Sequence, residues 1–103
     1  MSGVNQPFGT FYETVAASQT AQVLGVTGGA GGAGDTLMRL IITVTTSATS
    51  QVTLLDGATS YIIVPAVTPV GVYQIDINAV SVSGAWKVTT GAGVSVMGVG
   101  NFS

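Results

Sequence analysis

The sequence predicts an all-β fold: a single-domain antiparallel β-sandwich, jelly-roll-like, with about eight short strands and no substantial helix. Three observations support this prediction. Apolar and polar residues alternate with a period of two in successive segments. These segments recur at a spacing of roughly ten residues and are separated by clusters of Gly, Ser, Thr and Pro. No segment has the periodicity of a helix of normal length. The period alone does not separate a sandwich or jelly roll from a small barrel.

Each expected strand is bounded by turn residues or by a break in the alternation. The expected strands are residues 11–17, 20–26, 37–45, 51–55, 61–64, 71–77, 85–89 and 94–99. The residues that share a face within their strand are Ala21, Val23 and Gly25; Leu40, Ile42 and Val44; Tyr73, Ile75 and Ile77; Trp86 and Val88; Val94 and Val96. The dipeptide Asp56-Gly57 is typical of a tight turn, and Pro65 ends the fifth strand because proline has no amide to donate. In the sixth strand we expect Asp76 to point outward.

Two segments do not follow the strand pattern. Residues 1–10 form a polar N-terminal arm, and we place the sandwich domain at residues 11–103. The glycine-rich segment 25–35 is the second exception. Neither segment has enough large apolar residues for burial to offset the entropy of ordering its backbone. A neighbouring chain could order either one.

The glycine-rich segment contains a literal match to the dinucleotide-binding motif G-x-G-x-x-G at residues 29–34. That motif binds pyrophosphate only where a strand precedes it and a helix begins at it. Here the β-branched run 42–46 follows almost at once, and it favours a strand. We therefore interpret the segment as a loop between strands and not as a nucleotide site.

The composition excludes several classes of function. The chain has 103 residues, no Cys and no His, so disulfides and the usual ligands of zinc, copper and haem are absent. With two basic residues and a pI near 4.2 it cannot neutralise many nucleic-acid phosphates. No uninterrupted apolar run reaches the length of a membrane-spanning helix, and the first residues lack the features of a signal peptide. We expect neither a nucleic-acid nor a membrane partner.

Only six residues are charged, while 47% are hydrophobic and the mean hydropathy is +0.62. A folded monomer of this mass exposes about 5,300 Å², or one charge per ~900 Å². Ordinary soluble surfaces are about a quarter charged. We infer that much of this surface does not face water in the working state.

We expect no enzymatic activity and no cofactor. The carboxylates Glu13, Asp35, Asp56 and Asp76 are scattered in the sequence, and no His is present to act as a base near neutrality. A pair of carboxylates could still meet in space as an acid and base. No acidic cluster typical of a calcium loop is present.

The two cations, Arg39 and Lys87, lie in expected strands among apolar neighbours. Each either blunts a sheet edge or forms an ion pair with a carboxylate, within the chain or across an interface. We favour pairing, because a chain with so few charges rarely leaves them unused. Trp86 is expected in the core and not in a carbohydrate platform, and the tyrosines in the core or an interface.

Four stretches carry a resemblance to a known family. They are residues 12–25, 34–42, 52–57 and 83–96. These stretches resemble small virion structural proteins encoded in the structural gene clusters of tailed bacteriophages, such as capsid decoration or cement proteins. Residues 61–82 resemble the family less. The resemblance implies no catalytic or ligand residue.

The resemblance implies a protein made in the bacterial host cytoplasm and carried on the virion, at the phage capsid surface. We expect a homo-oligomer, a trimer in this reading, that bridges neighbouring subunits of the major capsid protein or other virion proteins. The arm would clamp an adjacent subunit. The expected interface residues are Phe8, Phe11, Tyr12, Arg39 and Lys87. The alternative is a host-surface carbohydrate-binding module on a phage fibre or tail tip, with Trp86 or a tyrosine exposed.

Overall fold

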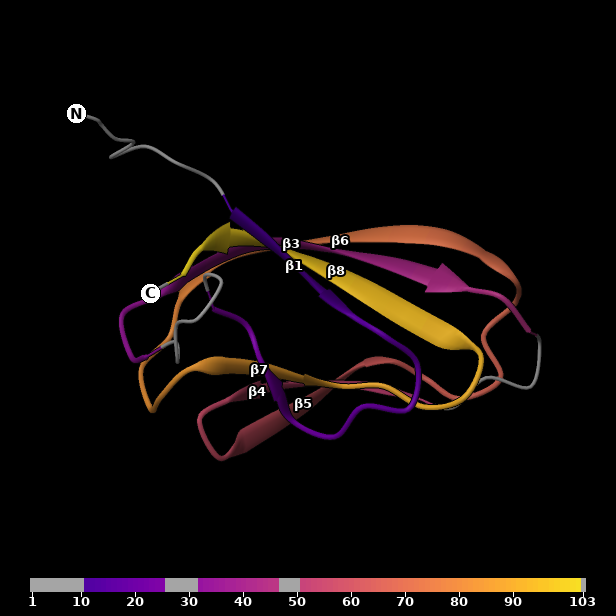
Figure 1. Cartoon of the computed structure of the whole chain (residues 1–103), viewed down its shortest axis with the longest axis horizontal. Coiled ribbons are helices and arrows are strands. Elements are labelled where there is room, and N and C mark those ends of the chain that lie inside the picture. Colours follow the sequence, from indigo (N-terminus) through magenta and orange to yellow (C-terminus); the bar gives the residue numbers. More distant parts are fainter. Residues whose placement is uncertain (1–10, 26–31, 47–50, 103) are drawn as a thin grey trace.

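Eight strands form two antiparallel four-stranded sheets in the computed structural model, which describes residues 11–25, 32–46 and 51–102 (Figure 1). The strands are β1 (Phe11–Val15), β2 (Gln22–Val23), β3 (Thr36–Val44), β4 (Val52–Asp56), β5 (Thr59–Val64), β6 (Gly71–Val80), β7 (Trp86–Thr89) and β8 (Val94–Asn101). The described residues contain no helix. The all-β fold and the number of strands are therefore as the sequence predicts.

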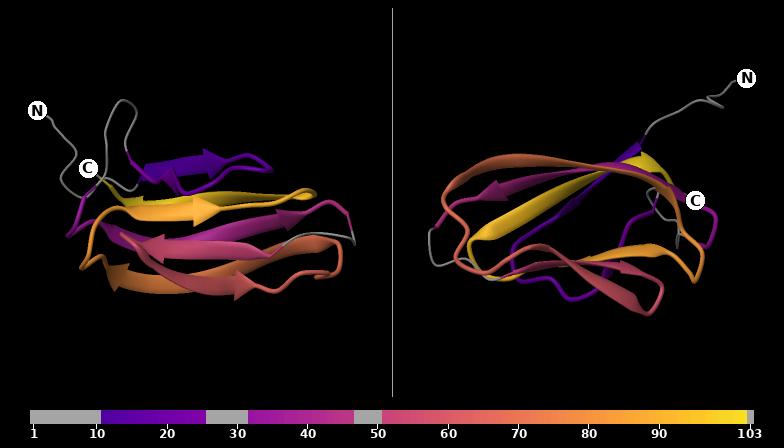
Figure 2. Two further views of the ribbon diagram at one scale, coloured as in Figure 1. Left: turned by 90° about the horizontal axis from the view of Figure 1, so that it is seen from below. Right: turned by 180° about the vertical axis from the view of Figure 1, so that it is seen from behind.

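The two sheets lie face to face as the layers of a sandwich (Figures 1 and 2). Sheet A has the strand order β1-β8-β3-β6, and sheet B has the order β2-β7-β4-β5. Among the described strands, only β4 and β5 are joined as a hairpin within one sheet, and the other successive strands alternate between the two sheets. This order is consistent with the predicted jelly roll.

The core fills the space between the sheets, because every second residue of the longer strands points inward. Its buried members are Val15, Leu24, Leu37, Leu40, Ile42, Val44, Val52, Leu54, Val64, Trp86, Val88, Val94, Val96 and Phe102. The predicted inward faces of β3, β7 and β8 are confirmed. In β6 the predicted alternation is also confirmed, since Tyr73, Ile75 and Ile77 pack against the core and Asp76 is exposed.

The predicted second strand, 20–26, is largely wrong. Its ladder is reduced to two residues of β2, and residue 26 lies outside the described residues. Ala21 has a positive φ of 47°, which breaks the alternation assumed from the sequence. The residue fully buried here is Leu24, whose amide continues the ladder by donating to the Trp86 carbonyl at 2.8 Å. Leu24 fits because Gly98 of β8 has no side chain: a Cβ there would lie 2.9 Å from Leu24 Cδ1.

A β-bulge interrupts the pairing of β3 with β6. Leu37 pairs with Ala79, but Arg39 pairs with Asp76, so β6 has one extra residue in this interval. Asn78 within it has a positive φ of 50°, a conformation that asparagine tolerates better than most residues. Beyond the bulge, the register from Asp76 back to Gly71 is regular.

Candidate interaction surfaces

Two of the four carboxylates are used to hold the fold together. The Asp56 carboxylate accepts hydrogen bonds from the backbone amides of Val82 and Ser83, at 3.1 and 3.0 Å to Oδ1. Its second oxygen accepts from Val82 as well, at 3.1 Å. Asp56 therefore joins the end of β4 to the loop that follows β6.

Asp35 has a similar role at the start of β3. Its side chain accepts from the Gly32 amide at 3.0 Å, and its carbonyl accepts from the Ser81 amide at 2.9 Å and from Trp86 Nε1 at 2.9 Å. Trp86 is only 5% exposed, so the prediction that it belongs to the core is confirmed. The end of the glycine-rich segment is thus tied to β6 and β7.

A row of side chains crosses the outer face of sheet A. Tyr12 pairs with Val99, Val99 with Arg39, and Arg39 with Asp76, so the row contains one residue from each strand of the sheet. Tyr12 is 68% exposed, and Asp76 is the one exposed member of the six charged residues. We call these four residues the sheet A row. It brings together two of the residues that the sequence predicts at an interface.

Within this row, the Arg39 side chain has a hydrogen-bond donor that lacks a partner. Its Nε is buried from solvent and has no hydrogen-bond partner in the described part of the chain, although Asp76 lies directly opposite. Asp76 instead accepts a hydrogen bond from Gln74 Nε2 at 3.3 Å. A buried donor without a partner costs roughly 1–3 kcal/mol. An acceptor supplied by a docked surface would remove that cost.

The other predicted interface residues do not join the sheet A row. Lys87 lies between the buried Trp86 and Val88 of β7, so its side chain projects from the outer face of sheet B. The backbone of Phe11 begins β1 opposite Gly100. Phe8 lies outside the described residues.

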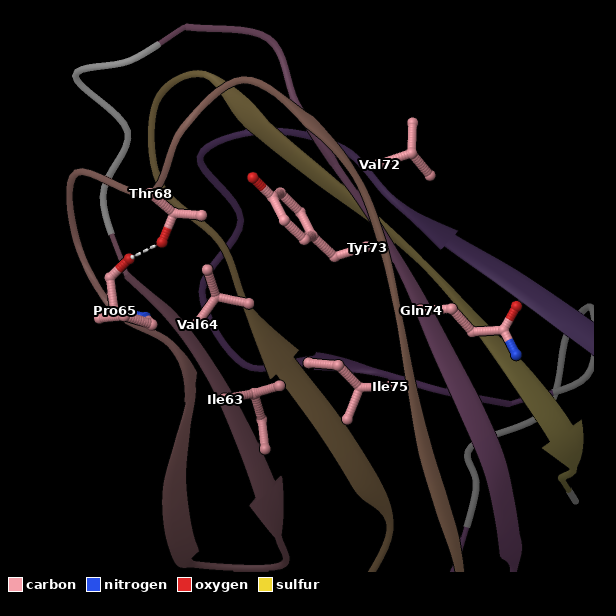
Figure 3. A pocket seen from close by; sticks show the side chains of 8 residues that line it. All are labelled: Ile63, Val64, Pro65, Thr68, Val72, Tyr73, Gln74 and Ile75. Atoms are coloured by element: carbon pink, nitrogen blue, oxygen red, sulfur yellow. Dashed lines mark hydrogen bonds between the residues drawn. The ribbon is translucent and has the colours of Figure 1, made fainter.

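A groove opens where the free edges of the two sheets meet. It lies between β5 and β6, the terminal strands of sheets B and A, and has a volume of about 530 Å³. Its lining residues, which define the β5–β6 groove, are Ile63, Val64, Pro65, Thr68, Val72, Tyr73, Gln74 and Ile75. Figure 3 shows Ile63 and Ile75 pointing toward one another from the two strands, while Val72 and Gln74 point away.

The polar groups of the groove are already paired with the protein. Thr68 Oγ1 donates to the Pro65 carbonyl at 2.7 Å, and the Tyr73 hydroxyl donates to the Pro69 carbonyl at 2.7 Å. The first bond lies within the loop 65–70, and the second joins that loop to β6. A small-molecule site normally has a few polar groups that orient its ligand. Since the hydroxyls here are occupied, the groove is suited to an apolar group.

Exposed apolar residues surround this groove. Val67, Val70 and Val72 are 72%, 60% and 68% exposed, and Ile62 is 63% exposed on the neighbouring strand. No charged residue occurs between Asp56 and Asp76 in the sequence. From residue 57 to residue 75, the loop and the two edge strands therefore have no charged side chain.

The groove was not predicted from the sequence, although the sequence contains one feature that indicates it. The absence of charge over residues 57–75 is visible in the sequence. What the sequence does not reveal is that β5 and β6 are edge strands of different sheets. Their inward residues are consequently only half-covered, as for Ile63, Tyr73 and Ile75.

The described residues include no group of three or more His, Cys, Asp or Glu that could hold a metal ion. They also include no helix with the length and apolarity that a membrane crossing requires. The surfaces that remain as candidates are suited to contact with other macromolecules. In comparisons with known proteins, no family model, no curated protein and no solved structure matches this chain.

Proposed function

We propose that this chain is a structural virion protein, a capsid decoration or cement protein that oligomerises and stabilises a bacteriophage head by bridging capsid subunits. The observation that carries the proposal is the contrast between charge and apolar exposure at the surface. Within the described residues, which include all six charged ones, Asp76 is the one exposed charged residue and Glu13, Arg39 and Lys87 are half-buried, whereas eight large hydrophobic residues are more than half exposed. Such a surface favours association with other protein surfaces over a hydrated monomer.

The apolar exposure lies on more than one side of the sandwich. Tyr12 and Val72 are on opposite edge strands of sheet A, and Ile62 is on the edge strand of sheet B. A protein that bridges neighbours needs at least two contact regions, one toward each partner. The sheet A row and the β5–β6 groove supply two regions of different chemistry.

The expected mechanism is mechanical. Each contact with a capsid subunit adds binding free energy that the internal pressure of a filled head must overcome. Apolar area supplies most of this free energy, at about 25 cal/mol per Å² before the costs of association. In the sheet A row, Arg39 would fix the orientation, because its unpaired Nε is satisfied only where the partner surface places an acceptor opposite it.

The alternative, a carbohydrate-binding module on a fibre or tail tip, has less support. Its leading aromatic residue, Trp86, is buried and hydrogen-bonded to Asp35. The exposed aromatic residues Tyr12 and Tyr61 belong to different sheets, on β1 and β5. They form no shared platform on which a sugar ring could stack.

A binding experiment with capsids tests the proposal. Purified chain would be mixed with expanded capsids assembled from the major capsid protein of the same gene cluster, and co-sedimentation would be measured at micromolar concentration. We expect saturable binding and a higher temperature of capsid disruption. Tyr12→Ala should weaken the binding, whereas Thr53→Ala, on the outer face of sheet B, serves as a position control.

The oligomeric state is measured in parallel by analytical ultracentrifugation. We expect a homo-oligomer, with a trimer as the predicted form. A chain that is monomeric at micromolar concentration and does not bind expanded capsids would contradict the proposal. Binding to host glycans with no binding to capsids would support the alternative.

A further inference from the structure

The β5–β6 groove adjoins a strand edge that is open to pairing. β6 is the terminal strand of sheet A, and its regular part, from Gly71 to Asp76, pairs with β3 and with no other described strand. That part contains no Lys or Pro, the residues that commonly protect an edge from further pairing. An extended segment could therefore hydrogen-bond along β6 while placing a side chain in the groove.

The groove restricts the chemistry of such a segment. Its walls are the apolar side chains of Ile63, Val64 and Ile75, and its hydroxyls are already paired. The segment 57–75, which contains all of the lining residues, has no charged side chain. The occupant must be an extended, uncharged segment with a large apolar side chain.

Residues 1–10 of this chain have these properties. The arm contains no charged side chain, and its one aromatic residue is Phe8, next to Pro7. Proline is accepted in an added edge strand, where its missing amide can face away from the partner. Four residues of the arm, Val4 to Pro7, are available to extend along β6 on one side of Phe8.

The arm cannot place Phe8 in the groove of its own chain. Through β8 and β3, Phe11 is in register with Ala79 of β6, and Tyr73 in the groove lies six residues further along β6. Phe11 and Tyr73 are thus three strand spacings apart across the sheet and six residues apart along the strand direction. This corresponds to a distance of about 24 Å between them. The three residue steps from Phe11 to Phe8 span at most about 11 Å. The occupied groove must belong to another molecule.

We propose that the arm of one copy docks in the β5–β6 groove of a neighbouring copy of this chain, with Phe8 as the buried anchor. The donor strand β1 and the acceptor strand β6 lie at opposite edges of sheet A. The contact is therefore head-to-tail, and repeated contacts close into a ring when the rotation permits. This inference specifies the homo-oligomer of the proposed function, but it concerns the isolated protein and requires no capsid.

Disulfide trapping between two single variants tests the contact directly, because the natural chain has no cysteine. Phe8→Cys would be mixed with Ile63→Cys under mild oxidation, because the Ile63 side chain points into the groove (Figure 3). The mixed disulfide dimer would be quantified by mass spectrometry. The control pair is Phe8→Cys with Ile62→Cys. Ile62 and Ile63 are neighbours on β5, but Ile62 is 63% exposed and does not line the groove, so trapping by random collision would favour the control. We expect at least tenfold more mixed dimer with Ile63→Cys.

Sedimentation equilibrium supplies a second measurement. Phe8→Ala removes the anchor without changing any described residue. Burial of a phenylalanine side chain corresponds to about ten- to hundredfold in association constant. We expect weakening of this size, and no change of oligomeric state for Val4→Ala beyond about threefold, since the smaller side chain buries less area.

Equal trapping with both partners, or none with either, would overturn the inference. It would also be overturned by native mass spectrometry that finds a small apolar molecule in the groove, or by trapping of Phe8→Cys to capsid protein alone. That last result would leave the proposed function standing. Conversely, strong trapping to Ile63→Cys in a protein that does not bind capsids would support the arm contact and contradict the capsid role.

Discussion

The carboxylate of Asp56 should contribute more to stability than its position beside a turn suggests. It accepts hydrogen bonds from two backbone amides, those of Val82 and Ser83, in the loop after β6. A hydrogen bond to a charged group contributes about 1.5–3 kcal/mol. Val82 is itself 81% exposed, so water reaches the amides freed by a substitution. Taking the low value for each amide, Asp56→Ala should lower the free energy of unfolding by about 3 kcal/mol.

Two further variants make this prediction specific. Asp56→Asn keeps one neutral acceptor oxygen, so we expect a loss of about half, near 1.5 kcal/mol, because neutral hydrogen bonds contribute about 0.5–1.5 kcal/mol. Asp76→Asn is the matched control, since that carboxylate is exposed and accepts only a long bond from Gln74. Its effect should stay within about 0.5 kcal/mol.

Equilibrium unfolding in urea measures these differences. Trp86 is the sole tryptophan and is buried, so its fluorescence reports the transition without labelling. All variants must be compared at one protein concentration, because self-association raises apparent stability. A change below 0.5 kcal/mol for Asp56→Ala, or equal losses for the Asp56 and Asp76 variants, would refute the reasoning.

Three other substitutions have defined outcomes. Gly57→Ala should cost about 2 kcal/mol or more, since Gly57 has a φ of +61° and a Cβ there would lie 2.9 Å from the Ser83 backbone; urea unfolding by fluorescence checks this, and an unchanged midpoint would contradict it. Trp86→Phe should cost about 2 kcal/mol through the lost bond to the Asp35 carbonyl and the smaller ring; circular dichroism must follow unfolding here, and wild-type stability would contradict it. Arg39→Met should leave the free energy of unfolding unchanged or raise it by up to about 1 kcal/mol, because a buried unpaired donor is removed. The same substitution should weaken capsid binding. A large loss of stability in urea unfolding would contradict this prediction and show that Arg39 is paired.

The strands with a clear period of two were predictable from the sequence, and the physical reason is local. In β8, and in β3 after its bulge, one face is buried, and in β6 one face is half-buried, so alternation marks both the strand and its inner face. β2 was not predictable in this way. It pairs over two residues only, and Leu24 is buried because a glycine in the distant β8 leaves space for it.

The candidate surfaces were only partly predictable. Tyr12 and Arg39 were identified, but their alignment with Asp76 depends on the bulge at Asn78, which shifts the register of β3 and β6. A bulge of this kind has no signature in a single sequence. The groove arises from the meeting of two edge strands, and edge positions follow from strand order, which periodicity does not contain.

The two buried carboxylates show a similar limit. The sequence placed Asp56 at a turn and Asp35 at a loop end, and both positions are confirmed. The Asp56 carboxylate has its partner 26 residues away, at the Val82 amide, and the Asp35 backbone carbonyl has one 51 residues away, at Trp86 Nε1. Contacts of this separation depend on how the sheets pack and not on any local pattern.

Cryo-electron microscopy of the intact native virion tests the central claim most directly. The cement role predicts density for a two-layered β-sandwich of this size, repeated over the capsid lattice and in contact with more than one capsid subunit. The sheet A row or the groove should lie in those contacts. Density confined to the tail or a fibre tip would contradict the cement role and favour the alternative, and absence of the protein from the particle would contradict both.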